Sequence, residues 1–421
     1  SASNLQVGII GAGIAGLAAG IAMRRAGHDV VIYEKSSFKQ EIGAAVSATP
    51  NMVRILDRWG FDFKRARAWP TLQIRVPNGT TLELEYQDSF GGLEGEYGHT
   101  WLSMHRVDLH KELRSVAENP ANHPTKPVAI ELGSEVIDIN CEEGIIIFND
   151  GSRISKDLVV VADGAHSRHL QLITGKPIPM IDTGRSVYRA LVPMNKVLEK
   201  PALLQLFENQ APGFVSIQGP SPLVSAFTYP CREGTLLNYV LLHPTKHRDE
   251  DKDSTQWNHP ATKDDLRECL QGFHPDWTSL CDALEEVKFF RMMHHEPLET
   301  MVRGKAVVIG DAAHPMLPVI AQGAASAVED AAALEAIFTT VSQEQDVRPY
   351  LKVFDLLRLP RNATTQVLSN HPMEPRSKIE ERLRGYPTRP AIPEVGVLWV
   401  RKPWRDFYFT YDVYAEAEKA K

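Results

Sequence analysis

The chain has 421 residues, which predicts two or three packed units, since a typical domain holds about 100–200 residues. Its apolar content of 43% and charged content of 24% are ordinary for a globular protein, and its net charge of −7 argues against nucleic-acid binding, which usually needs a basic excess. The four cysteines are far apart and form no CxxC pair, so neither a disulfide framework nor a zinc site is predicted. They fit a reducing, cytoplasmic location and a protein without bound metal.

The segment 7–23 is almost wholly apolar, as in a signal peptide or a membrane span. It lacks the basic region that precedes the apolar core of a signal peptide, and four glycines interrupt it. No other run approaches the ~18 apolar residues of a membrane helix. We therefore expect no membrane span, and the spacing of the glycines has another explanation.

A glycine-rich turn separates a predicted strand, 5–10, from an alanine-rich helix, 17–26. It contains Gly11, Gly13 and Gly16 in a GxGxxG pattern, and the next predicted strand, 29–34, ends in Glu34. This order is typical of a dinucleotide site, in which the helix N-terminus faces the phosphates and the acid holds the ribose hydroxyls. The acid disfavours a 2′-phosphate, so these residues fit FAD or NAD.

Two later segments each place an acid beside a glycine directly after a buried strand. The first strand, 158–162, precedes Asp163, and the second, 306–309, precedes Asp311. After the second acid, a loop leads into a long alanine-rich helix that carries Glu329 and Asp330. Regular βαβ units, which a nicotinamide dehydrogenase would show, do not continue along the chain.

The glycine motif and these two segments, in this order, make the chain resemble the single-component flavoprotein aromatic hydroxylases, the p-hydroxybenzoate hydroxylase fold. Within that group it looks most like the salicylate hydroxylase-like branch that is common among fungal natural-product enzymes. The resemblance covers roughly 5–340. The segment 105–110, with the sequence HRVDLH, and the ending around Tyr411 and Asp412 also fit this branch.

The resemblance implies a set of FAD contacts. The glycine motif and Glu34 would bind the ADP half, the backbone of Val136 would bind adenine, and backbone N–H groups near Gly323 would face the flavin. Such N–H dipoles stabilise negative charge on a reduced flavin. The expected cofactor-binding residues are Gly11, Gly13, Ala15, Gly16, Glu34, Lys35, Gly43, Ala44, Arg106, Val136, Asp163, Gly310, Asp311, Pro315, Gly323 and Ala324.

The expected fold class is α/β, with a Rossmann-like FAD-binding domain, a discontinuous substrate domain of sheet and helices, and a helical C-terminal region. We assign residues 1–72, 98–180 and 290–342 to the FAD-binding domain, 73–97 and 181–289 to the substrate-binding domain, and 343–421 to the C-terminal region.

The substrate domain is expected to be mainly a sheet. The predicted strands are 186–192, 223–229 and 236–242, and a hairpin over 71–86 is predicted to turn at Asn78-Gly79, a type I′ signal. Two short helices, 264–273 and 276–287, are predicted to begin at aspartate N-caps. A ligand is expected between this sheet and the flavin.

The resemblance implies that NADPH or NADH binds transiently and reduces the flavin, that O₂ adds to give a C4a-hydroperoxide, and that one oxygen atom enters an aromatic or indole-type small molecule. Secondary metabolism, such as alkaloid biosynthesis, is the expected setting, and the protein is expected to be a monomer or homodimer. Indole or alkene epoxidation with rearrangement, for example to a spirocycle, dearomatisation and decarboxylative hydroxylation remain open. A flavin-dependent reductase without oxygen insertion is the alternative from another class.

Three side chains are candidates for substrate binding or catalysis. Arg189 lies among apolar neighbours in a predicted strand, where it could bind a phenolate or carboxylate or instead form a salt bridge. Tyr229 could position a phenol or belong to the core. We predict Arg189 and Tyr229 as catalytic, whereas His314 beside the flavin loop is expected to be structural.

Overall fold

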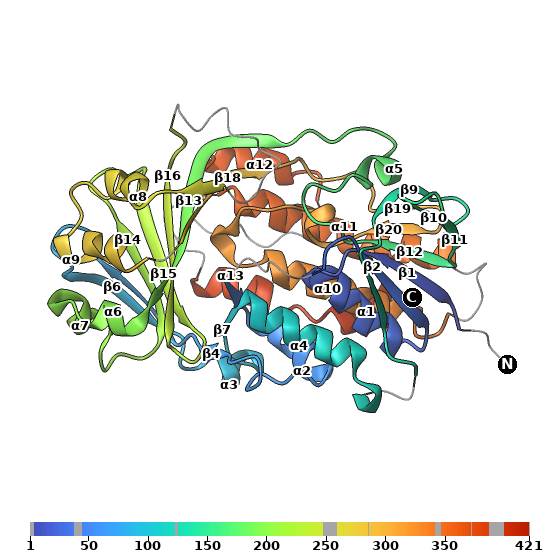
Figure 1. Cartoon of the computed structure of the whole chain (residues 1–421), viewed down its shortest axis with the longest axis horizontal. Coiled ribbons are helices and arrows are strands. Elements are labelled where there is room, and N and C mark those ends of the chain that lie inside the picture. The colour runs from blue at the N-terminus through green and yellow to red at the C-terminus, as the bar shows by residue number, and fades with distance from the viewer. Residues whose placement is uncertain are drawn as a thin grey trace.

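The computed structural model describes residues 4–37, 44–122, 125–246, 259–284, 286–341, 347–371, 373–386 and 400–420. Two sheets dominate it and lie at opposite ends of the molecule (Figure 1). The first has six strands in the order β19 (Val302–Arg303), β20 (Ala306–Val308), β12 (Leu158–Val161), β1 (Gln6–Ile10), β2 (Asp29–Glu34) and β8 (Ala129–Leu132).

The six-stranded sheet has the arrangement expected of a dinucleotide-binding domain. Neighbouring strands from β20 to β8 pair in parallel, and β19 pairs antiparallel at the edge. The strand β12 is a run of four buried apolar residues, as is typical of parallel strands covered on both faces. The helix α1 (Ile14–Arg25) packs on this sheet and against α10 (Gly323–Phe338) and α4 (Arg106–Glu118).

The second sheet has eight strands and is mostly antiparallel. Their order is β17 (His259–Ala261), β18 (Val287–His294), β13 (Ile181–Pro193), β16 (Leu236–Pro244), β15 (Ser225–Cys231), β14 (Gly213–Gln218), β5 (Gln73–Pro77) and β6 (Leu84–Ser89). The strand β18 crosses residue 290, at which the sequence analysis divides the two domains.

One face of the eight-stranded sheet is closed by short helices, and the other faces the part of the molecule that contains the six-stranded sheet (Figure 1). The closed face packs its apolar side chains, among them Tyr239 and Phe289, with Leu203 and Trp277 from the helices. These helices are α6 (Met194–Leu198), α7 (Pro201–Phe207), α8 (Lys263–Cys269) and α9 (Pro275–Thr278).

Small elements and long helices join the two sheets. The connecting strands are β3 (Ala45–Ala48), β7 (Leu102–His105) and β4 (Trp69–Pro70), and a further small sheet holds β9 (Val136–Asn140), β10 (Ile145–Phe148) and β11 (Arg153–Ser155). The later helices are α11 (Val347–Ser369), α12 (Arg376–Leu383), α13 (Lys402–Phe409) and α14 (Val413–Ala420). Of these, α11 and α14 pack against α10, and α12 packs against α11. The remaining α-helices of the described residues are α2 (Pro50–Arg58), α3 (Leu93–Tyr97) and α5 (Leu170–Thr174).

The predicted hairpin over 71–86 forms, but its predicted turn is wrong. A type I′ turn needs positive φ at both central residues, whereas neither Asn78 nor Gly79 has a positive φ and Leu82 takes the left-handed conformation instead, at φ 62°. The Asn78 side chain explains this, because its Oδ1 accepts hydrogen bonds from the backbone N–H groups of Thr80 and Thr81 and so stabilises a longer loop.

The two predicted aspartate N-caps are also wrong. The helix α8 begins one residue earlier than predicted and is capped by Thr262, whose Oγ1 accepts from the N–H of Asp265 in a reciprocal capping box. The helix α9 is capped by His274, whose Nδ1 accepts from the N–H of Asp276. The helix predicted over 276–287 is shorter, because the chain enters the sheet at Val287.

The cysteines and other side chains able to bind metal form few close groups in the described part of the chain. All four cysteines are free thiols. Among the described residues, no cluster of three or more His, Cys, Asp or Glu side chains is arranged to hold a metal ion, and no helix has the length and hydropathy to cross a bilayer.

Candidate functional site

The glycine turn between β1 and α1 is packed so closely that larger residues would not fit. A Cβ built on Gly16 would lie 1.9 Å from the carbonyl oxygen of Gly11, which is inside van der Waals contact. Gly11 itself has a φ of +95°, a conformation that glycine adopts without strain. These two glycines therefore shape the turn and hold the N-terminus of α1 against the sheet.

Gly13 differs from its neighbours because nothing lies near it. A Cβ built there would have no atom within 4 Å outside its immediate chain neighbours. Gly13 is the N-cap of α1, and no side chain caps that helix end. The first N–H groups of α1 are thus open to a ligand, as an approaching pyrophosphate requires. This open, uncapped cradle fits the ADP half of FAD.

Glu34 ends β2 beside the glycine turn. Its carboxylate accepts hydrogen bonds from the N–H groups of Ala12 at 2.8 Å and Ser36 at 2.7 Å. Its carbonyl accepts from the N–H of Ser134 at 2.9 Å, which places the start of β9, and so Val136, next to the same edge. Lys35 follows in the chain and is exposed.

The carboxyl edge of the sheet also gathers the two later acids. Asp163 follows β12, and its Oδ2 lies 2.8 Å from Nδ1 of His169, while its buried Oδ1 has no hydrogen-bond partner among the described residues. Gly310 lies close to α1, because a Cβ built on it would be 2.7 Å from Cβ of Ala15. Sequence reasoning overlooked His169, which lies six positions after the acid, where no motif marks it.

Asp311 lies near the first turn of α10. A Cβ built on Gly323 would be 3.9 Å from Asp311 Oδ1, so two residues predicted to contact FAD are adjacent. Asp311 is reached by solvent, but protein atoms surround its carboxyl group on most sides. The resulting loss of hydration raises the carboxyl pKa, although His314 and Arg106 oppose the rise. As in α1, no side chain caps α10 at its N-terminus, so N–H groups around Ala324 are free to bind a ligand.

Arg106 joins the predicted loop at 43–44 to α4. Its N–H donates to the carbonyl of Ala44 at 2.7 Å, and its side chain is exposed at the start of the helix. The same helix is tied to the eight-stranded sheet, because Arg232, which follows β15, donates two hydrogen bonds, at 2.6 and 2.9 Å, to the carboxylate of Asp108. Gly43 lies outside the described residues.

Arg189 points from β13 on the sheet face that looks toward the FAD domain. Neighbouring strands place Val240 beside it and Phe227 beside Val240, and the three side chains are half-buried on that face. Arg189 makes no hydrogen bond or ion pair with any described residue, and its nearest recorded ring, Phe290, is 5.5 Å away. Burial lowers the pKa of this guanidinium, and Arg106 lowers it further although Tyr229 opposes the shift.

Tyr229 lies two positions from Phe227 on the same face. Its hydroxyl donates to the carbonyl of Ala45 at 3.0 Å, and the amide oxygen of Asn238 accepts from the N–H of Ala45 at 3.3 Å. Burial raises the pKa of the Tyr229 phenol, so it stays protonated. The eight-stranded sheet therefore holds β3 through the N–H and the carbonyl of Ala45. The strand β3 directly follows the loop that is predicted to contact the flavin.

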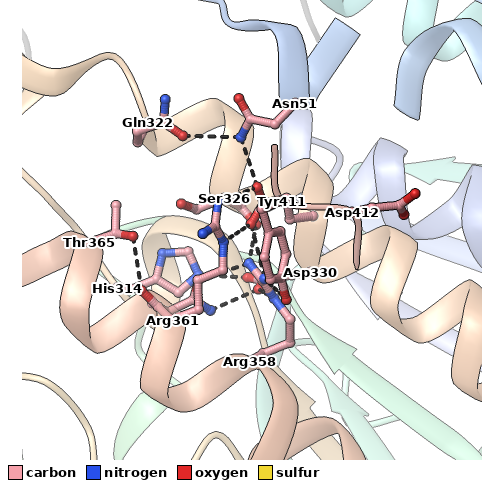
Figure 2. Close-up of polar contacts among 12 residues, drawn as sticks. Asn51, His314, Gln322, Ser326, Asp330, Arg358, Arg361, Thr365, Tyr411 and Asp412 are labelled. Atoms are coloured by element: carbon pink, nitrogen blue, oxygen red, sulfur yellow. Dashed lines mark hydrogen bonds and ion pairs between the residues drawn. The ribbon is translucent and has the colours of Figure 1, made fainter. Parts of the chain in front are cut away.

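His314 and Pro315, in the loop before α10, are buried and bound to protein. Nε2 of His314 lies 2.6 Å from Oδ2 of Asp330, and the Pro315 carbonyl accepts from Gln366 at 3.1 Å. These contacts agree with the expected structural part of His314. They adjoin a buried polar cluster that sequence reasoning did not assign, formed by the charged residues Glu329, Asp330, Arg358 and Arg361 and the amide of Asn362. Figure 2 shows Asp330, Arg358 and Arg361 of this cluster beside His314.

An open glycine cradle, an acid at the end of β2 and two uncapped helix N-termini on one sheet edge define a dinucleotide-binding protein. A family model described as an FAD binding domain matches residues 4–367. The chain belongs to this family, and FAD is its cofactor.

Known relatives extend over nearly the whole chain. Hispidin-3-hydroxylase of Neonothopanus nambi is 30% identical over 99% of this chain and 96% of its own length. The FAD-dependent monooxygenase cfoG of Aspergillus candidus is 30% identical over 93% of this chain and 91% of its own. A substrate complex of salicylate hydroxylase has the same fold, with a TM-score of 0.75, 24% identity and coverage of 100% and 99%. The chain is thus an oxidoreductase of the flavoprotein monooxygenase group.

Proposed function

We propose that this enzyme uses NADPH or NADH and O₂ to insert one oxygen atom into an aromatic or indole-type small molecule that carries a phenolate or carboxylate. The observation that carries the anionic part of the proposal is Arg189, a half-buried guanidinium without a counter-charge among the described residues. A buried, unpaired cation is costly, so an anion is its natural partner.

The side chains around Arg189 support the aromatic part of the proposal. Phe227, Val240 and Phe290 are half-buried apolar neighbours on the same sheet face, and aromatic rings pack favourably against such side chains. Salicylate hydroxylase and hispidin-3-hydroxylase, to which the chain is similar, are named for aromatic substrates. Secondary metabolism is the setting in which we place the reaction.

FAD, when bound, supplies the redox and oxygen chemistry, and the protein binds and orients. In this proposal Arg189 binds the anionic group of the substrate. The Tyr229 hydroxyl donates to the Ala45 carbonyl, so its oxygen can still accept a hydrogen bond from a substrate hydroxyl. The apolar side chains between them exclude water from the reacting ring.

The substitutions Arg189→Met and Arg185→Met test this assignment. Arg185 lies on the same strand, but its guanidinium already donates to a carbonyl, that of Leu223. With pairs of aromatic compounds that differ only in one carboxylate or phenol, the wild-type enzyme is expected to prefer the anionic member. Arg189→Met is expected to raise the KM for that member by ten- to a hundredfold, in line with the roughly 1.5–3 kcal/mol of a charge-assisted hydrogen bond.

Arg185→Met is expected to leave that KM within about twofold. Substrate-stimulated NADPH oxidation and oxygen uptake give the rates, and mass spectrometry of the product shows the oxygen gained. An unchanged preference for the anionic compound in Arg189→Met would exclude Arg189 as the anion site. NADPH oxidation without an oxygenated product in every pair would favour the reductase alternative.

A further inference from the structure

The residue before α10, Gln322, is held by two side chains at the start of α2. Asn51 Nδ2 donates to Gln322 Oε1 at 3.2 Å, and Gln322 Nε2 donates to Thr49 Oγ1 at 3.2 Å. Figure 2 shows Asn51 and Gln322 turned toward each other across the gap between the two segments. All three side chains are buried. One pair of amides therefore joins two segments that border the FAD site and lie 271 positions apart.

Glu329 fixes the direction of this chain of hydrogen bonds. Its Oε1 accepts from Asn51 Nδ2 at 2.8 Å. A carboxylate only accepts, so the amide of Asn51 must turn its NH₂ group toward Glu329. That same NH₂ group also reaches Gln322 Oε1, so Gln322 must turn its own NH₂ group toward Thr49. The four side chains form one polar path with a single orientation.

Two arginines from α11 keep Glu329 ionised. Arg361 donates to both of its oxygens, at 2.7 and 2.9 Å, and Arg358 lies 3.0 Å from Oε2. Burial alone would raise the pKa of Glu329, but Arg361 and Arg358 hold the pKa below the usual range. The ring of Tyr411, from the C-terminal segment, covers the Arg361 guanidinium at 3.6 Å.

The consequence falls on the first turn of α10. Its N–H groups have no side-chain cap, and the Gln322 side chain is engaged with Asn51 and Thr49. At the other end of the β3–α2 connection, Ala45 in β3 is held by Tyr229 and Asn238 of the eight-stranded sheet. We infer that Asn51 is a positioning residue of the FAD site. It holds the β3–α2 connection and the α10 N-terminus at a fixed distance and orientation, so that both can contact the flavin.

Asn51→Leu, a nearly isosteric change, tests the inference. Titration of apoprotein with FAD, followed by flavin fluorescence, is expected to give a Kd raised about tenfold, which corresponds to about 1.4 kcal/mol. The reduction potential of the bound flavin is expected to become more negative, because misplaced N–H dipoles stabilise the negative charge of the reduced form less well. Gln322→Leu is expected to act likewise, and the double variant to lose no more than either single one.

Glu335→Gln is the matched control on the same helix. Glu335 is also buried and paired, with Arg25 at 3.0 Å and the indole of Trp59 at 2.7 Å, but it contacts neither FAD-facing segment. This variant is expected to unfold at lower denaturant while its FAD Kd and potential stay unchanged. If Asn51→Leu does not fold, Gln322→Leu is compared with Glu335→Gln in the same way. Unchanged Kd and potential in the leucine variants, additive losses in the double variant, or an equal shift in Glu335→Gln would overturn the inference.

Discussion

At the residue scale, Gly13 and Gly16 have different parts in the same turn. Gly16 is needed by the fold, since a Cβ would meet the Gly11 carbonyl oxygen at 1.9 Å, whereas the position of a Cβ on Gly13 is empty. The φ of Gly13, −73°, suits alanine. A substitution at Gly16 therefore tests the packing of the turn, and a substitution at Gly13 tests the binding of the ligand.

Gly13→Ala is therefore expected to unfold at the same denaturant concentration as the wild type, but to bind FAD at least tenfold more weakly, because the methyl group occupies the space of the pyrophosphate. Gly16→Ala is expected to lose several kcal/mol of stability through the overlap. Urea unfolding of the apoproteins and FAD titration measure both. Wild-type FAD affinity in Gly13→Ala would place the pyrophosphate elsewhere.

His105 gives the protein a pH dependence of known sign. Burial, with Arg232 nearby, lowers its pKa to about 4, and its Nδ1 accepts a hydrogen bond from the N–H of Val107, which only the unprotonated nitrogen can do. The unfolded chain binds this proton near pH 6.5, so the contribution to stability is complete above pH 6.5 and is lost as pH falls toward 4.

His105→Asn keeps an N-cap acceptor without a titrating group. Between pH 7 and pH 5 the wild type is expected to lose about 2 kcal/mol more unfolding free energy than the variant. Urea unfolding at the two pH values measures the difference, and the other buried histidines contribute equally to both proteins. Parallel losses in both proteins would show that His105 does not titrate in this way.

Individual contacts were the hardest part of the site to predict. The sequence predicted Gly11, Gly13, Gly16, Glu34 and Asp311 because their spacing follows strand ends, where local geometry decides the role. It could not predict that Asn51 meets Gln322 or that His169 meets Asp163, because such pairings depend on tertiary packing. It also missed the caps at Thr262 and His274, which lie two positions before the aspartates predicted as N-caps, Asp264 and Asp276.

At the element scale, α10 is the central helix of the molecule. It is buried from Ala325 to Phe338 and packs against α1, α2, α11 and α14. A helix buried on all sides is normally apolar, yet this one carries Glu329 and Asp330. Asp330 accepts from the N–H of Gly310 at 3.1 Å and from Arg358 Nε at 2.9 Å, so it links the loop before α10 to α11.

Arg358→Met is expected to lower the free energy of unfolding by about 3–5 kcal/mol, because it leaves two buried carboxylates short of a counter-charge. Lys419→Ala, which removes an exposed pair with Glu416, is expected to change it by less than about 0.5 kcal/mol. Chemical denaturation of both variants measures these changes. Equal stability of the two variants would mean that the buried cluster contributes nothing to the fold.

The buried apolar strands and the alanine-rich helices were predictable, and the pairing of the strands between distant segments was not. Buried apolar runs at β1, β2, β12 and β20 and the alanine-rich α1 and α10 appear where the sequence places them, because local pattern decides them. The pairing of β5 beside β14 joins positions 140 residues apart, as in Gln73 with Gly213, and no local signal encodes it.

At the scale of the whole molecule, the two sheets lie at opposite ends, and the C-terminal helices α12 and α13 lie between them (Figure 1). These two helices pack with apolar residues of the eight-stranded sheet, such as Phe214 and Tyr229. The α/β class, the FAD-binding family and the flavoprotein hydroxylase resemblance are confirmed. The division into domains, the individual site residues and a monomer or homodimer stay predictions.

The most direct test of the account is one experiment on the purified protein. Its visible spectrum is recorded, and NADPH oxidation, oxygen uptake and product mass are followed with phenolic and carboxylated aromatic compounds under ¹⁸O₂. We expect bound FAD that is released on denaturation, substrate-stimulated uptake of oxygen, and a product that contains one labelled oxygen atom. A colourless protein that does not take up FAD, or a flavoprotein whose products contain no labelled oxygen, would contradict it.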